Sequence, residues 1–274
     1  MDHPVLMTGG SSGVGKATAA LLLARGHEVV SLDVKLCGNS KVTHHYCDLS
    51  DPAKIDAAIA GLEGPFSSLL NVAGVPNQAG PEVTMRVNFF GLRHFTEAVW
   101  DRITDGGTVV NVASIAGNNW RKRRGLHNEM MYVTCFDAGL AWWQAQRDNI
   151  GTDPYTFSKE AVVVYTMKLA GQGLARGIRV NDVGPGPVDT PIFPEFTEDV
   201  GDETMQYMVD MVGRPGNPHD IAEALVLKGS EPFLGLPSPT TTSPPAPPDH
   251  RAPTSRAART PPGPLLRSRS APAR

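Results

Sequence analysis

Residues 5–15 read VLMTGGSSGVG and are followed at 16–26 by KATAALLLARG. The apolar letters before the glycines predict a β-strand, and the Ala- and Leu-rich letters after them predict a helix that ends at Gly26. Glycines at a strand-to-helix turn let the backbone approach a pyrophosphate, and the start of the helix offers free N–H groups. A surface turn can also hold three glycines, but the order of strand, loop and helix favours a dinucleotide site. The segment therefore predicts the first unit of a dinucleotide-binding α/β fold.

An acidic residue follows the next predicted strand. Residues 28–32 have the apolar character of a strand, and Asp33 comes directly after them. A carboxylate at this place accepts hydrogen bonds from the ribose hydroxyls of NAD and repels the additional phosphate of NADP. Lys35 is a nearby cation that would instead favour NADP. On balance we predict NAD as the cofactor.

The segment YTFSK places Tyr155 and Lys159 four residues apart. This spacing puts both side chains on one face of a helix. A tyrosine has an ordinary pKa of about 10 and is a poor base at neutral pH. A close ammonium group lowers such a pKa by roughly 1 to 3 units, so the pair predicts a proton donor and acceptor for a hydroxyl or carbonyl.

The chain up to about residue 228 continues to alternate apolar strands with helices. Such alternation predicts a single-domain α/β fold of the Rossmann type, with a doubly wound parallel sheet and ligands at the carboxyl ends of its strands. Further strands are predicted at 42–47, 68–72, 108–112 and 178–183, and further helices at 52–60 (after a Ser50 cap), 84–102 and 155–176.

Composition narrows the classes of partner and compartment. The 274 residues carry a formal net charge of −3, but residues 230–274 hold six arginines and two acids, which leaves about −7 on the remainder. An acidic body argues against nucleic acid as a partner. No apolar run reaches membrane-spanning length, and the first strand leaves no room for a signal peptide. Three widely spaced cysteines predict neither a disulfide framework nor a metal site, so reduced thiols and a cytoplasmic location are expected.

Taken together, the motifs resemble the short-chain dehydrogenase/reductase family. They occur in the family order from residue 1 to about 228, and as a set they are specific. The family has a single-domain Rossmann-type fold and transfers a hydride between NAD(P) and an alcohol or ketone. The matching segments are TGGSSGVG at 8–15, Asp33, CDLSD with Asp48, NVAG at 71–74, VNFFG with Asn88, VNVAS with Ser114, YTFSK, and PGPVDTP at 185–191.

The resemblance assigns roles to individual residues. It implies that Tyr155 is the acid and base, that Lys159 lowers the tyrosine pKa and binds the ribose, and that Ser114 orients the substrate oxygen. It implies that Asn88 holds a water in a proton relay, although Ser114 alone would read as a turn residue and Asn88 alone as helix packing. The residues implied to bind the cofactor are Gly9, Ser11, Ser12, Gly13, Val14, Gly15, Asp33, Asp48, Leu49, Asn71, Ala73, Gly74, Tyr155, Lys159, Pro185, Gly186, Val188 and Thr190.

A long insertion separates Ser114 from Tyr155, about residues 117–153, and could contain an amphipathic helix at 136–147. With Asp33 it resembles the bacterial 3α-hydroxysteroid dehydrogenase/carbonyl reductase branch, which implies hydroxysteroids or other bulky ketones as substrates. The RKRR run at 121–124 is expected to be a solvated face, rather than a nucleic-acid patch. Trp142 and Trp143 are expected to anchor the insertion. Substrate contacts are expected from a flexible apolar lid after Gly184 that contains Phe193, Phe196, Met205, Tyr207, Met208 and Met211.

The end of the chain departs from the family pattern. Residues 213–227 resemble the last large helix, but residues 230–274 are rich in Pro, Arg, Ala and Ser, so we expect a disordered tail after a domain at 1–229. The tail resembles an out-of-frame reading of a GC-rich gene, with a genuine interaction tail as the alternative. The family's final edge strand, which builds a dimer contact in relatives, is expected to be missing, so the oligomeric state is open and a homodimer is one assembly to consider.

Two functions follow. The first is an NAD-dependent oxidoreductase of a secondary alcohol or ketone. The second is a catalytically weak NAD-binding protein, acting as a redox sensor or disrupted by its tail. The intact set of Ser114, Tyr155 and Lys159 favours the first, because a sensor does not need all three.

Overall fold

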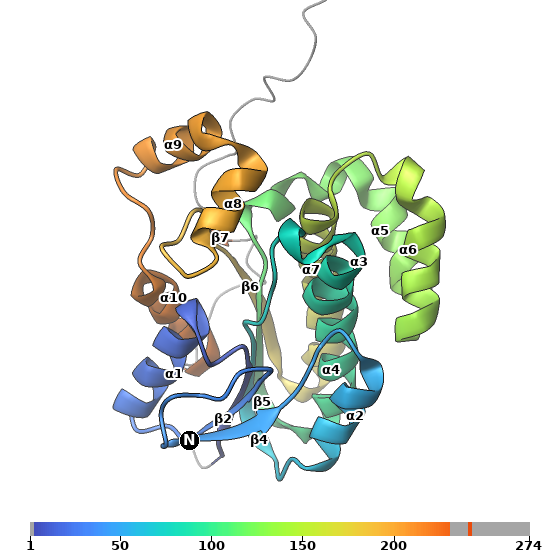
Figure 1. Ribbon diagram of the computed structural model, residues 1–274. Helices are drawn as coiled ribbons and strands as arrows, with labels where there is room; N and C mark the ends of the chain where they lie inside the picture. Colours follow the sequence, from blue (N-terminus) through green and yellow to red (C-terminus); the bar gives the residue numbers. More distant parts are fainter. Residues whose placement is uncertain (1–2, 231–240, 243–274) are drawn as a thin grey trace, which may run out of the picture.

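A computed structural model describes residues 3–230 and 241–242 (Figure 1). Its centre is a sheet of seven parallel strands in the order β3-β2-β1-β4-β5-β6-β7. The chain runs outward from β1 to β3 and then crosses back to β4, so the carboxyl ends of β1 and β4 lie at the point where the strand order reverses. Such a point is where ligands bind in open α/β sheets. The strands are β1 (Val5–Thr8), β2 (Val29–Asp33), β3 (Val42–Tyr46), β4 (Phe66–Asn71), β5 (Ile103–Val112), β6 (Arg179–Gly184) and β7 (Thr241–Thr242).

Helices cover both faces of the sheet (Figure 1). One face packs against α1 (Gly13–Ala24) and α10 (Pro218–Ser230), which contact each other. The other face packs against α2 (Pro52–Ala60), α4 (Leu92–Val99) and α7 (Pro154–Gly173). All six residues of β4 are buried, as expected for a strand covered on both sides. The predicted doubly wound α/β fold is confirmed.

The start of α2 corrects one predicted cap. Asp51, rather than Ser50, is the N-cap, because its side chain accepts a hydrogen bond from the Ala53 N–H. The Ser50 hydroxyl instead donates to Asp48, at 2.6 Å. Ser50 therefore holds Asp48, a residue of the expected cofactor site, while Asp51 caps the helix.

The single helix predicted at 84–102 is divided. It begins earlier, as α3 (Pro81–Met85), passes through a π-helical turn at Arg86–Gly91, continues as α4 and ends in a 3₁₀ turn at Trp100–Arg102. Gly91 lies in the π-helical turn, and a Cβ atom added there would lie 2.1 Å from the Leu49 carbonyl oxygen. The close approach requires glycine at this position and brings the helix against the Asp48–Leu49 segment.

The insertion is more helical than predicted. It contains a 3₁₀ segment (Ile115–Arg123), α5 (Arg124–Tyr132) and α6 (Phe136–Ile150), of which only α6 was expected. These helices lie outside α7 and α4, on the side of the molecule remote from α1 (Figure 1). Trp143 is buried as predicted, and Trp142 is partly buried against the same core.

The expectation of a fully solvated RKRR run is wrong for Arg123. Its guanidinium donates two hydrogen bonds to the carboxylate of Glu160, at 2.8 and 2.6 Å. Glu160 has no exposed surface, and His127 also contacts it at 3.0 Å. A buried carboxylate needs such partners, so Arg123 ties the insertion to α7.

Residues 193–230 contain the segment predicted as a lid and the last helix. Two short helices, α8 (Phe193–Val200) and α9 (Asp202–Asp210), stand above the carboxyl end of the sheet (Figure 1). The last helix, α10, includes Ser230, which the sequence assigned to the tail. A final edge strand was expected to be missing, but Thr241 and Thr242 pair with Val183 and Gly184, which satisfies part of the open edge of β6. The rest of the predicted tail lies outside the described residues.

Candidate active site

The glycine loop after β1 is shaped for close approach. Gly9 has φ of +77°, and a Cβ atom added there would lie 2.6 Å from the Ala73 nitrogen. A Cβ atom on Gly15 would lie 1.9 Å from the Gly9 carbonyl oxygen. Ser12 is the N-cap of α1, and its side chain makes no capping hydrogen bond. The first turn of α1 therefore keeps N–H groups available for an anionic ligand, so the loop fits a dinucleotide pyrophosphate.

Asp33 is held by backbone groups at the end of β2. Its two carboxylate oxygens accept hydrogen bonds from the N–H groups of Ser11, at 3.0 Å, and Lys35, at 2.9 Å. The Ser11 hydroxyl donates in turn to the Lys35 carbonyl. A carboxylate has about four acceptor sites, so Asp33 keeps the capacity to accept hydrogen bonds from ribose hydroxyls. Lys35 is exposed and also lines the cavity, so its positive charge lies at the same end of the cavity as Asp33.

The glycine loop and the YTFSK segment both line one cavity of about 1310 Å³ at the carboxyl ends of the strands. It extends from the glycine loop to the YTFSK segment and helix α8, as required if a long cofactor and a substrate are to meet. The predicted residues in its wall are Gly9, Ser12, Gly13, Val14, Gly15, Asp33, Asp48, Leu49, Ala73, Gly74, Ser114, Tyr155, Lys159, Pro185, Gly186, Val188 and Thr190.

Three predicted site residues lie outside this wall: Ser11, Asn71 and Asn88. Ser11 braces Asp33, as described above. Asn71 points into the protein, where its amide group donates to Thr96 and Asn111, each at 2.8 Å. The Asn71 side chain joins neighbouring strands to α4. It therefore points away from the cavity in which a cofactor would bind.

Asn88 lies in the π-helical turn, with no exposed surface. Its side-chain oxygen accepts from the Val75 N–H at 2.8 Å, and its amide group donates to the Val75 carbonyl at 2.9 Å and to Ser158 at 3.3 Å. The side chain thus clamps the turn after β4, and it lies close enough to Gly74 that a Cβ atom there would be 3.3 Å from its oxygen.

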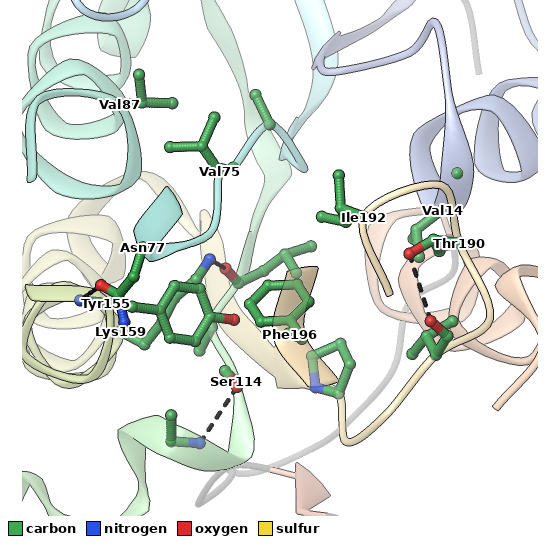
Figure 2. A pocket seen from close by; sticks show the side chains of 18 of the residues that line it. Val14, Val75, Asn77, Val87, Ser114, Tyr155, Lys159, Thr190, Ile192 and Phe196 are labelled. Atoms are coloured by element: carbon green, nitrogen blue, oxygen red, sulfur yellow. Dashed lines mark hydrogen bonds between the residues drawn. The ribbon is translucent and has the colours of Figure 1, made fainter. Parts of the chain in front are cut away.

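Tyr155, Ser114 and Lys159 converge at the middle of the cavity (Figure 2). Ser114 lies two residues after the end of β5 and caps the following 3₁₀ segment by accepting from the Ala116 N–H at 3.2 Å. The Lys159 ammonium donates to the Val112 carbonyl at 2.9 Å and lies 5.7 Å from the centre of the Tyr155 ring. The segment after β5 therefore supplies the Ser114 hydroxyl, and α7 supplies the Tyr155 phenol and the Lys159 ammonium, to the same part of the cavity.

Burial dominates the acid–base properties of this pair. It raises the pKa of Tyr155 to about 12, although the Ser114 hydroxyl acts in the opposite direction, and the carboxylates of Asp153 and Asp199 raise the pKa further. Burial also lowers the pKa of Lys159 to about 8. The predicted net depression of the tyrosine pKa is therefore wrong for this structure, because the loss of solvation on burial disfavours the charged phenolate.

Apolar side chains line the part of the cavity beyond Tyr155. The ring of Phe196, from α8, meets the Tyr155 ring edge to face, with 5.0 Å between the ring centres. Of the six residues predicted for the lid, Phe193, Phe196, Met205 and Met208 line the cavity. Tyr207 and Met211 are exposed instead. Residues that the sequence did not single out complete this wall, among them Val83. Val75, Val87 and Ile192 also belong to it (Figure 2).

The first turn of α7 is built by residues that sequence reasoning missed. Asp153 caps it by accepting from the Thr156 N–H at 2.9 Å, and Pro154 occupies the first helical position. Asn77 accepts from the Tyr155 N–H at 3.0 Å and donates to Asp153 at 3.0 Å. The Asp-Pro pair before YTFSK is a recognisable helix start and could have indicated the cap. Asn77 is 78 positions from Tyr155 and gives no such signal.

Comparison with known proteins identifies the family. The family model "short chain dehydrogenase" matches residues 3–126, and the model "Enoyl-(Acyl carrier protein) reductase" matches residues 139–230. Coniferyl-alcohol dehydrogenase of Pseudomonas sp. (strain HR199 / DSM 7063) is 36% identical over 231 residues, covering 84% of this chain and 90% of that protein. The chain belongs to the short-chain dehydrogenase/reductase family. It is an oxidoreductase of alcohols and carbonyl compounds by that membership.

Other relatives are more distant. Acetoacetyl-CoA reductase of Shinella zoogloeoides is 26% identical, covering 84% of this chain and 92% of that protein. The crystal structure of the 3-alpha-hydroxysteroid dehydrogenase from Pseudomonas sp. B-0831, complexed with NADH, superimposes with a TM-score of 0.67. It is 24% identical and covers 82% of this chain and 89% of that one, a level of identity that supports the shared fold. None of the helices described is long and apolar enough to cross a membrane.

Proposed function

We propose that this protein is an NAD(H)-dependent oxidoreductase that interconverts an alcohol and a carbonyl compound. The observation that carries the proposal is the convergence of Tyr155, Ser114 and Lys159 on the cavity that the glycine loop opens into. NAD(H) is favoured over NADP(H) because the carboxylate of Asp33 stands at the ribose end of that cavity. Gly9, Gly13 and Gly15 would hold the pyrophosphate.

Tyr155, Ser114 and Lys159 each have a different part in the proton transfer. A bound nicotinamide supplies or accepts the hydride. With a pKa of about 12, Tyr155 rests as a neutral phenol and can donate a proton to a carbonyl oxygen, while Ser114 donates a hydrogen bond to the same oxygen. In the oxidation of an alcohol the direction reverses. The Lys159 ammonium then stabilises the phenolate, which burial otherwise disfavours.

The apolar wall beyond Tyr155 favours a bulky substrate that contains rings. Phe196, Ile192 and the valines of this wall offer area for apolar contact. A relative is named for coniferyl alcohol and a structural neighbour for a 3-alpha-hydroxysteroid, so these compounds and their carbonyl forms are the first substrates to test. The proposal also includes membership in the 3α-hydroxysteroid dehydrogenase/carbonyl reductase branch. It includes a secondary alcohol as the reduced substrate and a cytoplasmic location.

The test compares two tyrosines on one helix. Each protein is assayed with the substrate panel and either cofactor, followed at the nicotinamide absorbance, and NADH binding is measured separately. Tyr155→Phe should lower kcat at least about 100-fold while NADH binding persists. Tyr165→Phe is the matched control, because Tyr165 lies on the same helix, outside the cavity wall, and its buried hydroxyl has no hydrogen-bond partner among the described residues.

Two results would overturn the proposal. A Tyr155→Phe protein with wild-type kcat would remove the acid–base role. A wild-type protein that binds NADH but converts no member of the panel would support the alternative, a catalytically weak NAD-binding protein.

A further inference from the structure

Asn77 occupies a junction between three parts of the site. It lies in a short 3₁₀ turn, Asn77–Ala79, directly after the segment that Asn88 clamps. Its side chain points toward the start of α7 beside Tyr155 (Figure 2). The side-chain oxygen accepts from the Tyr155 N–H, and the amide group donates to Asp153. The acceptor and the donor of the Asn77 amide are therefore both used at the N-terminus of α7, beside the proposed acid–base residue Tyr155.

The reason for this arrangement lies in the helix terminus. The first N–H groups of an α-helix have no partner within the helix. In α7, Pro154 has no N–H, Asp153 satisfies Thr156, and Asn77 satisfies Tyr155. Without Asn77 the backbone of Tyr155 loses its partner, so the ring position becomes less well determined.

The same turn also contacts the lid. Asp199 of α8 lies close enough to Asn77 for the backbone and side chain of Asn77 to act against the burial that raises the pKa of this carboxyl. The Gln78 side chain donates to the Glu195 carbonyl of α8. The Gln78 bond joins this turn to the helix that brings Phe196 against the Tyr155 ring. Asn77 thus lies beside the carboxylates of Asp153 and Asp199, which repel each other.

We propose that Asn77 is a positioning residue that holds Tyr155 in place, and that its turn, Asn77–Ala79, tethers helix α8 over the substrate end of the cavity. The proposal rests on the proposed function, because the cavity beyond Tyr155 is taken as the substrate site. Its consequence is that the position of α8 and the position of Tyr155 are coupled through one short turn.

The decisive variant is Asn77→Asp. It keeps an acceptor for the Tyr155 N–H, loses the amide donor and places a third carboxylate beside Asp153 and Asp199. We expect KM to rise about fivefold, equivalent to about 1 kcal/mol, while kcat changes less than about twofold. Adding Asp199→Asn removes one of the three carboxylates and should return KM most of the way to the wild-type value. Asn149→Asp, which adds the same charge on the exposed face of α6, is the control and should match wild type.

A second measurement does not depend on turnover. Hydrogen exchange of the full chain should be faster in the 193–200 segment of Asn77→Asp than in wild type, with the strands of the sheet unchanged. Faster exchange in this segment would support the tether even if no substrate in the panel is converted, so it separates this proposal from the proposed function. Unchanged exchange of the segment, or effects of Asn77→Asp and Asp199→Asn that simply add, would overturn it.

Discussion

Replacing Arg123 by Ala should destabilise the protein by about 3 kcal/mol. The substitution removes two of the three hydrogen bonds to the Glu160 carboxylate and leaves His127 as its remaining described partner. Breaking a buried ion pair by deleting one partner costs about 3–5 kcal/mol, because the other charge stays buried. We take the lower end, because the Arg123 side chain is 17% exposed and water can reach the vacated space.

Urea denaturation and a thermal melt measure this effect. For a chain of this size, about 3 kcal/mol corresponds to a fall in Tm of roughly 6–12 °C. Arg124→Ala is the matched control, because Arg124 is the next residue in the run and is exposed. The double variant Arg123→Met with Glu160→Gln should recover much of the loss, because it removes the unpaired charge. A cost below about 1 kcal/mol for Arg123→Ala would refute the view that this pair anchors the insertion to α7.

Three further predictions concern other parts of the chain. Wild type should gain stability relative to Lys159→Met as the pH rises from about 8 toward 10.5, measured by urea midpoints. The sign follows because the pKa of Lys159 is lowered by folding, so in this range the unfolded chain binds more protons. Asp33→Asn should narrow the preference for NAD(H) over NADP(H) in kcat/KM, and a wild-type preference for NADPH would show that Lys35 governs the choice. Ending the chain at Ser230 removes only the pairing of β7 with Val183 and Gly184 from the described structure, so a fall in Tm beyond about 4 °C would contradict the assignment of residues 230–274 to a dispensable tail.

Local patterns were sufficient for the fold class and for most residues near the cofactor loop. The strand before TGGSSGVG, the helix after it and the position of Asp33 are set by short-range preferences of glycine, apolar runs and strand ends, which a sequence displays directly. The spacing of Tyr155 and Lys159 likewise needs only the helical repeat. For this reason the predicted residues that line the cavity come almost entirely from contiguous motifs.

Tertiary structure decided the properties that depend on residues distant in the chain. The pKa of Tyr155 is raised because the folded protein removes solvent from the phenol, and no spacing of residues reveals how much solvent is lost. Arg123 reads as a surface charge until the fold brings the buried Glu160 carboxylate beside it. Asn77 acquires its place at the start of α7 through a contact that spans 78 positions of sequence. Sequence alone thus determined which chemical groups this protein carries and in what local frame, whereas packing decided their solvation and their partners, because both depend on which surfaces the whole chain buries together.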